Sequence, residues 1–157
     1  MFELANVARP GVSEYISGSG ALSALDNRLE GFKTPLIVTG EKSYAAFTKF
    51  YKGNREFRVA KYDGSASFED MQRIADEYGE GVDVVLGVGG GRVIDTAKGV
   101  AQNLNVEYMT VPTVIATCAP YAPVAAVYHP DHTFREVAYF KRTAYACVAD
   151  LDLLLES

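Results

Sequence analysis

Residues 82–98 read VDVVLGVGGGRVIDTAK and join a strand pattern to a helix pattern through a cluster of glycines. The apolar, β-branched run 82–86 is typical of a parallel strand that is buried on both faces. From Arg92 to Leu104 apolar residues recur at intervals of three and four, which is the helical period. The glycines between the two patterns allow a sharp turn of the backbone. The stretch therefore predicts a strand, a tight turn and a helix in succession.

The same alternation of strand and helix patterns extends over the first two thirds of the chain. Ser67 is followed three positions later by Asp70, which predicts a capped start for the helix at 68–78. This order of elements predicts an α/β fold with a Rossmann-like, mostly parallel sheet flanked by helices. The predicted strands are 36–38, 57–59, 82–86 and 108–111, and the predicted helices are 20–29, 42–50, 68–78 and 92–104.

After Pro112 the alternation stops. The segments 126–128 and 134–139 flank the polar turn 129–132 and predict a β-hairpin near the C-terminal end. A last apolar strand at 146–149 leads to Asp150 and to the leucine-rich residues that follow it. These leucines begin a helix that lacks a partner surface, so we expect the sequence to be part of a longer protein.

Length and composition limit the class of protein. The 157 residues suit one domain, which we predict to span residues 1–157. A formal net charge of −5 argues against a nucleic-acid partner. Cys118 and Cys147 are too few and too far apart for a zinc ribbon or a disulfide scaffold, which favours a cytoplasmic location. No apolar stretch approaches the roughly 18 residues of a membrane span, so we expect no membrane contact.

The glycine cluster is a candidate anion site. Free backbone N–H groups and the helix dipole at such a turn attract a pyrophosphate, and glycines let it approach closely. Arg92 stands where the dinucleotide fingerprint has its third glycine, and the segment lacks the ending of a P-loop. The alternative is a tight turn without a ligand. Asp95 and Lys98 are three residues apart, so they either pair on the helix surface or Lys98 reaches into the cleft.

A second candidate segment, residues 111–120, reads VPTVIATCAP and follows a predicted strand. Ligands of open α/β sheets bind at the carboxyl ends of strands, so this segment shares a crevice with the glycine cluster. Thr113 and Thr117 can donate to phosphate or amide oxygens. Alternatively, these hydroxyls satisfy backbone groups nearby.

Taken together, the two segments resemble the iron- or zinc-dependent alcohol dehydrogenase superfamily and, within it, the glycerol dehydrogenase branch. Its members carry GGG-(K/R)-x-x-D-x-A-K and VPT-x-A-(S/T)-x-A-P segments in this order, followed by a hairpin. The resemblance extends from about Phe32 to Leu155. It implies that residues 1–157 are the N-terminal nucleotide-binding domain of a homo-oligomeric enzyme, whose helical C-terminal domain is absent from this sequence.

The resemblance also implies roles for individual residues. It implies NAD or NADP as the cofactor, a divalent zinc or iron ion as the metal, and a small alcohol, a polyol or a 2-hydroxy or 2-oxo acid as the substrate. Asp150 matches the one metal ligand that this domain supplies. The residues implied to contact the cofactor are Gly89, Gly90, Gly91, Arg92, Val93, Thr113, Val114, Ala116, Thr117, Ala122, Val124 and Tyr128.

Two positions depart from the glycerol dehydrogenase pattern. Cys118 replaces the Asp that contacts the substrate hydroxyl, and no ribose-binding acid stands near Gly40. The sequence therefore looks closer to a side branch that resembles hydroxycarboxylate dehydrogenases. Lys42 can pair with a 2′-phosphate, so NADP is as open as NAD. Gly40 and Lys42 are included among the cofactor residues, and Cys118 and Lys98 are the candidate catalytic residues.

Other interpretations remain. Cys118 as a nucleophile lacks an evident activating base, and His129, Asp131 and His132 either grip a metal or form a solvated turn. A different class of function is a stand-alone nucleotide-binding or regulatory module without catalysis. A third is a binder of sugar phosphates on the same glycines, which leaves Asp150 unexplained.

Overall fold

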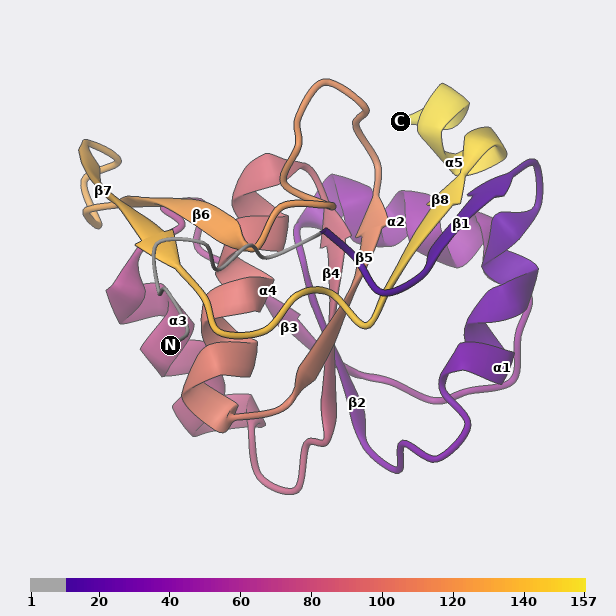
Figure 1. Cartoon of the computed structure of the whole chain (residues 1–157), viewed down its shortest axis with the longest axis horizontal. Coiled ribbons are helices and arrows are strands. Elements are labelled where there is room, and N and C mark those ends of the chain that lie inside the picture. The colour runs from indigo at the N-terminus through magenta and orange to yellow at the C-terminus, as the bar shows by residue number, and fades with distance from the viewer. Residues whose placement is uncertain (1–10) are drawn as a thin grey trace, which may run out of the picture.

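A computed structural model describes residues 11–157 as three layers, with one sheet between two layers of helices (Figure 1). The sheet has six parallel strands in the order β1-β8-β5-β4-β2-β3. Three of these strands, β2, β4 and β8, are buried along their whole length. The strands are β1 (Tyr15–Gly18), β2 (Pro35–Thr39), β3 (Arg58–Lys61), β4 (Val84–Gly89), β5 (Glu107–Pro112) and β8 (Ala146–Asp150).

Alternate residues of the strands enter two separate cores, because successive side chains of a strand point to opposite faces. On one face Ile37 and Leu86 pack against the elements η2 (Ala21–Ala24), α1 (Leu25–Arg28), α2 (Glu41–Phe50) and α5 (Leu151–Glu156). On the other face Leu36 and Val85 pack against α3 (Phe68–Tyr78) and α4 (Gly91–Leu104). Both faces of the sheet are therefore covered, as parallel sheets require.

The hairpin of β6 (Val124–Tyr128) and β7 (Phe134–Tyr139) is antiparallel and separate from the sheet. Ala125 and Val127 of β6 are buried, whereas most of β7 is exposed. The N–H group of Tyr128 donates to the carbonyl of Ala66, 3.1 Å away, at the start of α3. The hairpin therefore extends the layer that α3 and α4 form, at the left of Figure 1.

The α/β fold, the parallel sheet and the hairpin predicted from the sequence are confirmed. The Ser67 cap is also confirmed, since its hydroxyl accepts the N–H of Asp70 at 3.1 Å. The helix predicted at 20–29 is instead a 3-10 turn and a single helical turn. Among residues 11–157, no helix combines the length and the apolar character needed to cross a bilayer.

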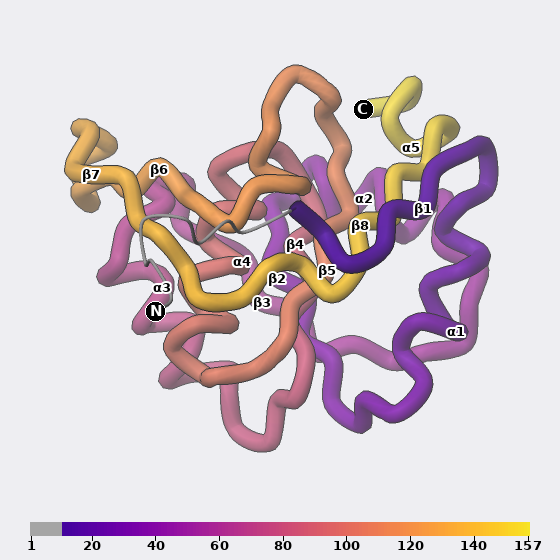
Figure 2. Tube along the Cα trace, in the orientation of Figure 1, coloured from indigo at the N-terminus to yellow at the C-terminus, as the bar shows by residue number. Residues whose placement is uncertain are grey.

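Strand β1 is absent from the sequence-based prediction. It has only four residues and pairs only with β8 among the described strands. Figure 2 shows β1 and β8 side by side, one indigo and one yellow, although they come from opposite ends of the described chain. A short strand whose partner is so remote carries no local periodic signal.

Candidate cofactor-binding site

The glycine cluster lies where β4 ends and α4 begins. Gly90 is the N-cap residue of α4 and has an extended backbone. A Cβ atom added at Gly89 would lie 2.8 Å from the Cβ of Val93, so a side chain does not fit there. At Gly90 it would meet only the Cγ2 of Val114, at 3.6 Å. The backbone at the start of this 14-residue helix is therefore open to an anion.

A second helix begins beside this turn. The Thr39 hydroxyl, at the end of β2, donates to the Val88 carbonyl at 2.8 Å and lies 2.9 Å from the Ser43 hydroxyl. The Ser43 oxygen in turn accepts the N–H of Gly40 at 3.0 Å. These bonds attach the start of α2 to the strand that carries the glycine turn. Two helix N-termini therefore face the same edge of the sheet.

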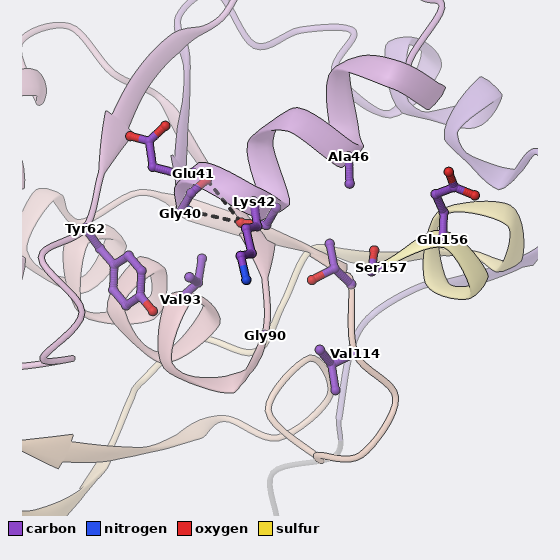
Figure 3. A pocket seen from close by; sticks show the side chains of 12 residues that line it. Gly40, Glu41, Lys42, Ala46, Tyr62, Gly90, Val93, Val114, Glu156 and Ser157 are labelled. Atoms are coloured by element: carbon purple, nitrogen blue, oxygen red, sulfur yellow. Dashed lines mark hydrogen bonds between the residues drawn. The ribbon is translucent and has the colours of Figure 1, made fainter.

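A cavity of about 570 Å³ opens between these two helix starts. Lys42 and Gly40 line it from α2, and Glu156 and Ser157 line it from the C-terminal end of the chain (Figure 3). The Glu41 carboxylate pairs with Lys61 at 2.9 Å. The volume of the cavity suits a small-molecule ligand. The cavity brings together six of the predicted residues, namely Gly40, Lys42, Gly90, Val93, Thr113 and Val114.

Residues 113–123 form the loop that faces the glycine turn. The N–H of Thr113 donates to the Gly89 carbonyl at 3.0 Å, and a Cβ at Gly91 would lie 3.5 Å from the Thr117 hydroxyl. Thr117 accepts the N–H of Ala119 at 3.1 Å, so this hydroxyl satisfies the local backbone. Ala116 and Cys118 are exposed, and Cys118 is a free thiol. The loop therefore presents its residues 114–118 to the space beside the turn.

Lys98 and Asp95 form an ion pair at 3.4 Å, but the pair is buried rather than on the helix surface. Burial lowers the pKa of the Lys98 ammonium, and the Asp95 carboxylate opposes this shift. Burial likewise raises the pKa of Asp95, against the effect of Lys98. The ammonium donates to the carbonyls of Ala122 and Val124, at 2.7 Å each. The structure therefore directs Lys98 to the backbone where the loop meets the hairpin, and not into the cavity.

Arg92 lies over the hairpin and does not line the cavity. Its guanidinium carbon is 4.2 Å from the centre of the Tyr128 ring, a cation–π contact. One of its nitrogens lies 3.5 Å from Nδ1 of His132, which has a left-handed backbone at φ 73°. The contacts predicted between the cofactor and Arg92, Tyr128, Ala122 and Val124 stay predictions.

The Asp150 carboxylate is a helix cap. One oxygen accepts the N–H groups of Asp152 and Leu153, and the other accepts that of Leu22 at 2.9 Å. Only 2% of the residue is exposed. Residues 11–157 contain no group of three His, Cys, Asp or Glu side chains that could hold a metal. The described residues therefore do not form a complete metal site on their own, and the role of Asp150 as the one metal ligand from this domain stays a prediction.

Comparison with known families decides the identity of the fold. The family model described as iron-containing alcohol dehydrogenase matches residues 12–152. The chain belongs to this family. This confirms the resemblance drawn from the two glycine and threonine segments. The residues that the family model matches include the glycine turn, the loop 113–123 and the hairpin.

Several members of the family are similar to this chain. Glycerol dehydrogenase of Thermotoga maritima is 29% identical over 153 residues, which are 91% of this chain and 41% of that protein. Hydroxycarboxylate dehydrogenase A of Escherichia coli is 43% identical over 96 residues, 61% of this chain and 26% of that protein. A probable glycerol dehydrogenase from Sinorhizobium meliloti has a crystal structure that matches with a TM-score of 0.85 and 25% identity. This match covers 96% of this chain and 42% of that one.

The chain spans about two fifths of the length of the first of these relatives.

Sequence reasoning missed several residues that line the cavity. Glu41, Ser43, Ala46 and Tyr62 lie there, with Glu156 and Ser157 from the C-terminal end of the chain. Ser43 had a local signal, because it follows Gly40 by three positions as a capping residue does. The others reach the cavity through the packing of α2, the end of β3 and the C-terminal end of the chain, and no local sequence pattern indicates this packing.

Proposed function

We propose that residues 1–157 are the NAD(P)-binding domain of an oxidoreductase that transfers hydride between a nicotinamide cofactor and a small alcohol, polyol or 2-hydroxy acid. The observation that carries this proposal is the cavity of about 570 Å³ between the glycine turn and the start of α2. One wall offers free backbone N–H groups and the other offers a lysine. This combination suits the two ends of a pyrophosphate-linked nucleotide.

Each wall has a distinct task in this proposal. The N–H groups after Gly90 bind the pyrophosphate, because the first turn of a helix leaves its donors without partners. The start of α2 receives the adenosine ribose. The loop that contains Thr113 then directs the nicotinamide end towards the substrate. Bound NAD(P) supplies the hydride chemistry, and these residues orient it.

The choice between the two cofactors depends on the turn at Gly40. Glu41 is the only acid at this turn, and it is paired with Lys61. In Figure 3 it points away from Lys42. At the start of α2 a ribose diol therefore meets only a carboxylate that is paired with Lys61, whereas a 2′-phosphate meets a lysine and a helix N-terminus. This arrangement supports NADP over NAD.

The relatives support the reaction class. Similar proteins are named glycerol dehydrogenase and hydroxycarboxylate dehydrogenase, and another is named glycolaldehyde reductase. A divalent zinc or iron ion, a homo-oligomeric assembly and a cytoplasmic location belong to this proposal for the whole protein. The two free cysteines support the last point.

A matched pair of variants tests the proposal. Gly90→Ala adds a methyl group where there is room, and Gly90→Asp adds a carboxylate at the same point. Calorimetric titration with NADH and NADPH should give saturable binding for the wild type and for Gly90→Ala. Gly90→Asp should lose it, because its charge repels the pyrophosphate. Absence of binding by the folded wild type, or retention by Gly90→Asp, would overturn the proposal.

A further inference from the structure

The Lys98 ammonium is buried where α4 passes under the start of the hairpin. Its side chain is fully buried, and all three of its donors are used. Two of them bind the carbonyls of Ala122 and Val124 at 2.7 Å each, and the third faces Asp95 at 3.4 Å. Hydrogen bonds from a charged donor are stronger than those between neutral groups. The ammonium therefore fixes two backbone carbonyls of one short segment.

Asp95 holds the same segment from its other side. Its second oxygen accepts the N–H of Ala126 at 3.1 Å. Two side chains on one turn of α4 thus bind three backbone groups within residues 122–126. The Thr110 hydroxyl adds a fourth bond nearby, to the Pro120 carbonyl at 2.9 Å. The segment that leaves the loop is therefore attached at several points.

Stability alone does not account for a buried ion pair here. Removing two charges from water is costly, and an apolar pair of similar volume often stabilises a core as well. What the charged pair adds is a fixed position for the backbone that it binds. That backbone follows the exposed residues 114–118 of the loop, of which Thr117 lies beside Gly91 at the start of the same helix. One helix therefore carries the glycine turn and anchors the loop opposite to it.

We propose that Lys98 is a positioning residue, whose ammonium fixes the carbonyls of residues 122 and 124 and so sets the gap between the loop 113–123 and the glycine turn. This inference rests on the proposed function. It assigns Lys98 to the nicotinamide half of the cleft without contact to substrate or cofactor. The adenosine half is built from α2 and the glycine turn and does not depend on Lys98.

Ligands that fill different halves of the cleft separate this role from a general effect on folding. ADP occupies the adenosine and pyrophosphate positions, and NADH or NADPH also occupies the nicotinamide position. For Lys98→Met, we expect NAD(P)H binding to weaken about ten-fold while ADP binding changes by less than about two-fold. The emission maximum of the bound reduced nicotinamide should also move towards that of the free cofactor. Lys33 is an exposed lysine that precedes β2, and Lys33→Met is the control.

Asp95→Asn loosens the same segment from its other side and should show the same separation of ADP from NAD(P)H. It decides the question if Lys98→Met does not fold. Equal weakening of both ligands, or unchanged NAD(P)H affinity and emission in the folded variants, would overturn the role of Lys98. Failure of the wild type to bind NADH and NADPH would instead overturn the proposed function, so the two failures are distinguishable.

Discussion

Lys42 is the lysine that lines the cavity, and it forms no ion pair among residues 11–157. A charge in water at about 4 Å contributes roughly 1 kcal/mol. Lys42→Ala should therefore raise the Kd for NADPH about five-fold and leave the Kd for NADH nearly unchanged. Parallel titrations of the two cofactors measure this ratio. Lys33→Ala controls for net charge, and an equal change for both cofactors would contradict the assignment.

Single residues also show how far a sequence predicts a site. Gly90, Val93 and Thr113 were predicted because each lies in a contiguous segment whose chemistry depends on neighbours along the chain. The environment of Lys98 was not predictable in this way. Its acceptor carbonyls are 24 and 26 residues away, and only the packed hairpin brings them to the ammonium. The sequence thus reveals which polar groups occur, and tertiary packing decides which of them face the cavity.

At the scale of elements, Asp150 connects three of them. It ends β8, caps α5 and accepts a hydrogen bond from η2. Its loss would leave three backbone N–H groups without this acceptor, and Leu22 and Leu153 are buried. Buried donors without partners are costly. The Asp150 carboxylate therefore attaches β8 and α5 to η2 and stabilises the C-terminal end of the domain.

Asp150→Ala should lower the free energy of unfolding by about 2 kcal/mol, even in the presence of a chelator. Urea denaturation monitored by circular dichroism measures this difference. Asp152→Ala, which removes a carboxylate from an exposed bond to Ser19, serves as the matched control. If the chelator abolishes the difference between wild type and Asp150→Ala, then metal binding rather than capping explains the residue.

Element boundaries illustrate the same division between local and remote causes. The helix at 68–78 was predicted with its actual bounds, because Ser67 marks the start and the apolar face is regular. The helix predicted at 20–29 was too long. Gly20 adopts a left-handed backbone at φ 76°, and a 3-10 turn follows it. The leucines of this segment, Leu22, Leu25 and Leu29, do belong to the core, but the backbone that carries them is not one regular helix.

For the whole molecule, the spacing between the helix layer and the sheet depends on Gly87. A Cβ at this position in β4 would lie 2.8 Å from the Cβ of Ala97 and 3.3 Å from the Cα of Ile94. Helix α4 therefore packs directly on the strand backbone. Because α4 carries the glycine turn at one end, this close contact also determines the height of the turn above the sheet.

Gly87→Val should move α4 away from the sheet and lower the free energy of unfolding by about 3 kcal/mol, the upper end for overpacked cores. It should also weaken NAD(P)H binding in the fraction that remains folded. Urea titrations with and without cofactor measure both effects. Gly90→Ala adds a methyl group three residues further along the chain without a steric conflict and should not change stability in this way. Wild-type stability in Gly87→Val would show that the layers can adjust.

The position of β1 in the sheet has a consequence for synthesis of the chain. Tyr15 pairs with Cys147 and Gly18 with Asp150, so the first described strand joins the sheet only through the last one. A ribosome adds residues from the N-terminus, at roughly 5–20 per second. The leucines that follow β1 therefore wait, without the strand that completes their core, until residue 150 has left the exit tunnel. Contacts of such long range slow folding, so this part of the core is among the last to form.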